Sequence, residues 1–106
     1  MRWEANEDKV CCLIYIKNHV LNKSKLSTSI QEAEFFGVDK TEGSIMMKFN
    51  NIASLCDDYG IKTSATINRL AHYSRQNQAM FESVKDFSLT EILAELNKCR
   101  IGLLDK

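Results

Sequence analysis

The sequence predicts an all-α protein of about five helices, with a helix-turn-helix core followed by two additional C-terminal helices. Proline is absent and glycine occurs only four times, which favours long uninterrupted helices over a turn-rich sheet. Apolar residues recur three and four positions apart, most clearly between residues 41 and 56. A chain of 106 residues suits one helical domain. We therefore expect a single domain, 1–106, with the core at 3–60 and a C-terminal helical extension at 61–106.

The first two predicted helices lie between residues 6 and 37. Asn6 is a good N-cap residue, and a strongly apolar helix is expected to run from it to about Val20. A polar loop, Asn22–Lys25, follows. A capping box at Ser29 and Glu32, or one residue earlier, starts a short second helix that ends at Gly37.

The third predicted helix is the one around which the rest is organised. Asp39 and Glu42 form a capping box at its start, and it ends near Asp58. Ile45 and Phe49 begin an apolar stripe that faces the core. The opposite stripe is small and polar and is expected to point outward; it consists of Lys40, Ser44, Met47 and Asn51, with Thr41 and Lys48 on one flank. Two helices joined by a glycine-containing turn, the second with a polar outer face, form the helix-turn-helix pattern.

Two more helices are expected after Gly60. A fourth begins at Thr63 or Ser64 and reaches Val84, with a polar middle. The fifth begins with a capping box at Ser88 and Glu91. It has an apolar face that either docks on the core or pairs with a second copy of the chain.

Charge is balanced overall but unevenly distributed along the chain. Fourteen basic residues match fourteen acidic ones, so no overall field favours nucleic acid. Two stretches lack acids, however. One lies between Asp8 and Glu32 and carries four lysines, including Lys23 and Lys25; the other carries Lys62, Arg69, His72 and Arg75, which could follow a phosphate backbone or simply face water.

The sequence offers no catalytic or metal site. His19 and His72 lack a carboxylate at a spacing that would orient them, and neither stands beside a cysteine at zinc-ligand spacing. Cys11 and Cys12 lie in an apolar segment, where thiols are buried and reduced rather than reactive. We expect no enzyme activity, no cofactor and no metal. The polar amino end and the lack of a long apolar run predict a cytoplasmic protein without membrane contact.

Two segments carry a resemblance to a known family. W-x-x-x-E-D (Trp3 to Asp8) and G-S-I-M-M-K-F-N-N-I-A-S-L (Gly43 to Leu55) resemble the amino-terminal module of bacterial HNH-type restriction endonucleases and, more distantly, Myb/SANT-like three-helix domains. The resemblance covers roughly residues 3–60 and implies a helix-turn-helix arm whose third helix contacts DNA. The family's nuclease half, with its metal-binding His and Asn, has no counterpart here. An arginine that commonly precedes the third helix is replaced by Lys40 and Thr41.

Two functions follow as hypotheses. The first is a small bacterial or phage DNA-binding protein, for which a regulatory role and a homodimer formed through the C-terminal helix are further expectations. Its third helix would enter the major groove of double-stranded DNA through Lys40, Thr41, Ser44, Met47, Lys48 and Asn51, while Lys23 and Lys25 hold phosphates. Alanine at Lys48 or Asn51 should then weaken DNA binding without lowering thermal stability. The alternative is a phage-encoded anti-CRISPR or other anti-defence inhibitor that binds a nucleic-acid-handling protein complex.

Overall fold

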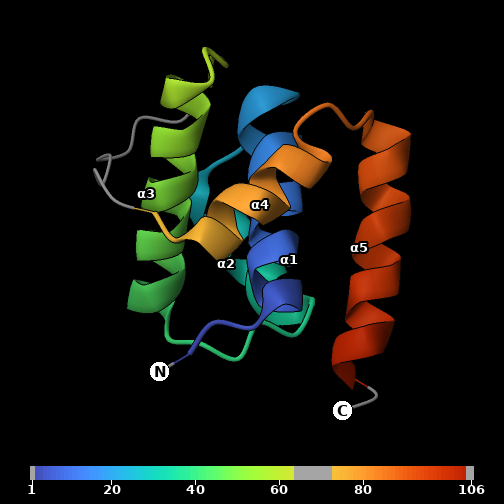
Figure 1. Ribbon diagram of the computed structural model, residues 1–106. Coiled ribbons are helices and arrows are strands. Elements are labelled where there is room, and N and C mark those ends of the chain that lie inside the picture. Colours follow the sequence, from blue (N-terminus) through green and yellow to red (C-terminus); the bar gives the residue numbers. More distant parts are fainter. Residues whose placement is uncertain (1, 64–72, 105–106) are drawn as a thin grey trace.

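The computed structural model is all-helical, in agreement with the sequence, and describes residues 2–63 and 73–104, with side chains up to Cys99. Five α-helices and one short π-helix lie in these residues: α1 (Ala5–Tyr15), η1 (Ile16–Val20), α2 (Leu26–Phe35), α3 (Glu42–Asp58), α4 (Arg75–Val84) and α5 (Leu89–Leu104). Helix α1 runs through the middle and contacts the other four α-helices (Figure 1). Helices α3 and α5 flank it on opposite sides, and α4 crosses over it.

The central place of α1 explains its apolar composition. Every residue from Val10 to Tyr15 is fully buried, because neighbouring helices cover the helix on all sides. Ile45, Phe49 and Ile52 of α3 are also fully buried, so the predicted inner stripe of the third helix is confirmed. Phe81, Ile92 and Leu96 add the contributions of α4 and α5 to the same core.

The predicted start of α5 is confirmed, but three other helix starts differ. The Ser88 and Glu91 side chains each accept a hydrogen bond from the other's backbone N–H, as a capping box requires. Helix α1 instead starts at a capping box of Glu4 and Glu7, two residues before the predicted site. Helix α2 starts after Lys25, and α3 after Thr41, whose hydroxyl accepts from Ser44 N.

The predicted fourth helix is shorter than expected. Tyr73 and Ser74 are not helical, and the Ser74 hydroxyl caps α4 by accepting a hydrogen bond from Asn77 N at 2.9 Å. A polar N-cap competes with continued helix at that point. The remainder of that prediction, residues 64–72, lies outside the described residues. None of the described helices is long and apolar enough to cross a membrane.

Candidate functional site

Two buried ion pairs join the start of α1 to α3 and to the turn before it. Glu7 Oε1 lies 2.7 Å from Lys40 Nζ, and Asp8 Oδ1 lies 2.6 Å from Lys48 Nζ. All four side chains are at most 7 % exposed. Charges removed from water in this way are stable only when paired, so the four groups hold one another in place.

Trp3 and Gln76 complete this cluster, which we call the charge cage. The ring of Trp3 lies under both ammonium groups, with its centroid 5.3 Å from Lys40 Nζ and 4.6 Å from Lys48 Nζ. Gln76 of α4 donates to an Asp8 carboxylate oxygen and, at 3.0 Å, to the carbonyl oxygen of Trp3. The charge cage therefore connects the amino-terminal segment with α1, α3 and α4.

Hydrogen bonds keep the Glu7 carboxylate ionised. Burial raises the pKa of Glu7, but hydrogen bonds from the Lys40 ammonium and from the backbone N–H groups of Glu4 and Asp39 outweigh it and leave the pKa below its usual value. The turn before α3 is thus fixed to α1 through a charged group. The two segments that carry the family resemblance, Trp3 to Asp8 and Gly43 to Leu55, meet here through Asp8 and Lys48.

The charge cage corrects the predicted positions of two lysines. Lys48 was expected on an exposed flank and Lys40 on the outer stripe, but both side chains are 7 % exposed and ion-paired within the chain. The helical wheel places Lys48 at the edge of the apolar stripe, and the acids of α1 draw it inward. Neither ammonium group is available to a phosphate without breaking a buried pair.

The first half of the outer face of α3 is open. Thr41, Glu42 and Gly43 are exposed, Met47 is 57 % exposed, and Ser44 and Asn51 are half-buried. The predicted outward orientation of Ser44 and Met47 is therefore present, although the face contains no free cation. Farther along the same face, Ser54 is buried.

Exposed acids and large exposed apolar side chains lie on α2, on α3 and in the turn between them. Glu34, Asp39 and Glu42 are exposed, and none forms an ion pair with a described residue. Phe35 is 61 % exposed, more than any other large apolar side chain in the described part. We call these three acids, with Phe35 and Met47, the α2–α3 surface.

This surface is not evident from the sequence alone, because the neighbouring residues Phe35 and Phe36 are both apolar and only Phe36 packs against the core. Helical spacing could have separated Phe35 from Phe36. Phe36 lies three positions after the buried Ala33 and packs against the core, whereas Phe35 points away. The sequence contains these acids, but it does not show that Lys40 and Lys48 point inward and leave the acids as the exposed charges.

The remaining predicted basic residues that the structure describes lie outside the charge cage. Lys23, Lys25, Lys62 and Arg75 are exposed and form no ion pair with a described residue. Lys23 and Lys62 line one pocket just beyond the carboxyl end of α3. Arg69 and His72 lie outside the described residues.

A buried polar cluster links η1 to α2 without forming an active site. His19 Nε2 lies 2.7 Å from Ser29 Oγ, and Asn18 donates to Ser29 Oγ and to Glu32. Histidine and serine together suggest nucleophilic catalysis, yet both side chains are at most 1 % exposed, so substrate cannot reach them. Burial lowers the pKa of His19, which favours the neutral ring.

The thiols and acids of the described residues show no reactive or metal-binding arrangement. Burial raises the pKa of Cys11 and Cys12 well above the usual value, which keeps both thiols protonated and inert. Among residues 2–63 and 73–99, no group of three or more His, Cys, Asp or Glu side chains is arranged to hold a metal ion. Comparison with protein-family models, curated proteins and solved structures finds no match.

Proposed function

We propose that the chain is a non-catalytic inhibitor that binds another protein through the α2–α3 surface. The observation that carries this proposal is the inward placement of Lys40 and Lys48, because it leaves the acids Asp39 and Glu42 as the exposed charges at the start of α3. Asp39 and Glu42 have uncompensated carboxylates at the start of α3, and these repel the phosphates that flank a DNA groove.

The same surface has the make-up of a protein-binding site. Phe35 and Met47 supply large exposed apolar side chains of the kind that fill pockets on a partner, and Met adapts readily to irregular surfaces. The surrounding acids favour a positively charged partner. Proteins that handle nucleic acid present positively charged surfaces of this kind. The proposed setting is therefore a phage-encoded anti-CRISPR or other anti-defence protein in the bacterial cytoplasm.

Phage plating tests this proposal. The chain is expressed in bacteria that each carry one CRISPR or restriction system, and the plating efficiency of a targeted phage is measured. Wild type should restore plating against one system, and Phe35→Ser with Met47→Ser should abolish the effect. Leu93→Ser is the matched control, because Leu93 is 47 % exposed on α5. Inhibition that survives the double substitution would contradict the assignment of the surface.

A second candidate, DNA binding, is favoured by the open first half of α3. Recognition helices contact base edges through their first turns, and Thr41, Gly43 and Ser44 are small enough for close approach. Met47 would touch a thymine methyl group, and Lys23, Lys25 and Lys62 would hold phosphates. Dimerisation through α5, where Leu89 and Leu93 are exposed, would strengthen binding.

Salt dependence separates the two candidates. Fluorescence anisotropy of a labelled random duplex is measured at about 50 and 200 mM salt. The inhibitor proposal predicts no binding at either concentration. Binding that weakens steeply with salt, and that is lost on replacement of Lys23 and Lys62 by glutamine, would favour DNA binding instead.

A further inference from the structure

One surface pocket brings together two lysines that are far apart in the sequence. It has a volume of about 290 Å³ and is lined by Val20, Leu21, Asn22, Lys23, Lys62 and Thr63. Lys23 follows η1, whereas Lys62 follows α3. No acidic side chain of the described residues lines this pocket, so its charge is positive.

The backbone that carries Lys23 is fixed by hydrogen bonds. Leu21 N donates to Ile16 O at 2.9 Å, which closes the π-helical turn, and Ser24 N donates to Asn18 O at 2.9 Å. The Asn22 side chain donates to Lys17 O at 3.2 Å. Short π-helices are frequent at functional sites, and η1 ends at Val20, which lines the pocket.

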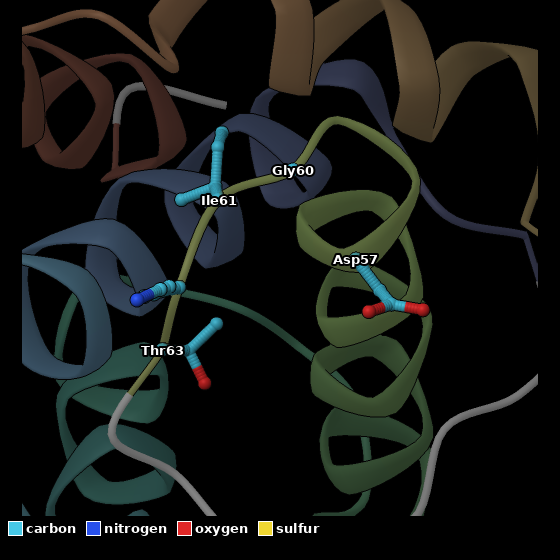
Figure 2. Close-up of a pocket in the computed structure, with 5 residues that line it drawn as sticks. Asp57, Gly60, Ile61 and Thr63 are labelled. Carbon is cyan, nitrogen blue, oxygen red and sulfur yellow. The ribbon is translucent and has the colours of Figure 1, made fainter.

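The opposite wall is fixed as well. Gly60 has φ 70°, which turns the chain at the end of α3, and Ile61 N donates to Cys56 O at 2.7 Å. Tyr15 OH donates to Thr63 Oγ1 at 3.3 Å and holds the segment against α1. Figure 2 shows the extended Ile61 to Thr63 segment beside α3, where a neighbouring pocket of about 380 Å³ shares Lys62 and Thr63 but also contains Asp57.

We propose that the pocket lined by Lys23 and Lys62 binds the phosphate group of a small phosphate monoester. Lys23 and Lys62 come from separate segments and line the same pocket, where a dianion can pair with both ammonium groups. The pocket is at the lower limit of size for drug-like ligands and suits a phosphate group with bound water. The inference does not depend on the proposed function.

The test is a titration with inorganic phosphate followed by amide NMR, against sodium chloride at equal ionic strength. Residues 20–23 and 62–63 should shift with phosphate and not with chloride, with a Kd in the millimolar range. Lys23→Gln and Lys62→Gln should each raise the Kd about tenfold. Lys25→Gln is the matched control, since Lys25 is an exposed lysine two residues away that does not line the pocket. Its Kd should be unchanged.

A second arm identifies the source of the phosphate. Adenosine 5′-monophosphate should produce the same shifts as inorganic phosphate, and adenosine should produce none. Equal weakening by Lys25→Gln and Lys23→Gln would show a diffuse electrostatic effect and overturn the proposal. Equal shifts with chloride would also overturn the proposal, as would binding to an oligonucleotide in the absence of binding to inorganic phosphate or adenosine 5′-monophosphate.

Discussion

Removing the Lys48 ammonium should destabilise the protein strongly. In Lys48→Ala the Asp8 carboxylate, which is fully buried, loses the ion pair at 2.6 Å. Breaking a buried pair by removal of one partner costs about 3–5 kcal/mol, and loss of the contact with Trp3 adds to this. Since domains of this size are stable by about 5–15 kcal/mol, this is a large fraction of the total. The melting temperature should fall by about 12 °C or more.

Urea unfolding followed by circular dichroism measures this free energy. Replacing both charged groups, as in Asp8→Asn with Lys48→Met, should be less damaging than Lys48→Ala, because no uncompensated charge remains. Lys98→Ala is the control: that ammonium is 74 % exposed, and its removal should change little. A loss for Lys48→Ala below about 1 kcal/mol, with DNA binding weakened, would refute the charge cage and restore Lys48 as an exposed DNA contact.

Three further changes in stability follow from the structure. Gly60→Ala should destabilise the protein by about 1 kcal/mol or more, because φ of Gly60 is 70°. Gly43→Ala should stabilise it by up to about 1 kcal/mol, because nothing lies within 4 Å of an added Cβ. Urea midpoints that move in the same direction for both variants would contradict this. Burial lowers the pKa of His19 below 6.5, so as the pH falls His19 is protonated in the unfolded chain before it is protonated in the folded protein. Stability should therefore be retained above pH 6.5 and lost below it, and His19→Gln should flatten that dependence in unfolding curves. Asn77→Leu should stabilise by about 1–2 kcal/mol, since Asn77 is fully buried and its Oδ1 accepts no hydrogen bond from the described residues; a lower melting temperature would show that the amide is needed.

The helical class and much of the core could be predicted from the sequence. Spacing alone placed Ile45, Phe49 and Ile52 on the inner side of α3, and the Ser88 capping box located α5. Both signals are local, because periodicity and capping depend on residues within one or two turns.

The candidate site could not be predicted in the same way. Lys40 and Lys48 look like surface residues until the acids of α1 are brought against them, and that contact joins residues more than thirty positions apart. Ser29 illustrates the same problem. It was expected to cap α2, but it lies inside the helix, where its hydroxyl meets Asn18 and His19. Tertiary contacts overrode a valid local signal in each case.

The central claim is that Lys40, just before α3, and Lys48, within α3, are both internal. Reductive methylation of the native protein, followed by mass spectrometry of its peptides, measures the accessibility of each lysine directly. Lys23, Lys25 and Lys62 should react quickly, while Lys40 and Lys48 should react only on unfolding. Rapid methylation of Lys40 and Lys48 in the folded protein would place both ammonium groups in solvent and contradict the account.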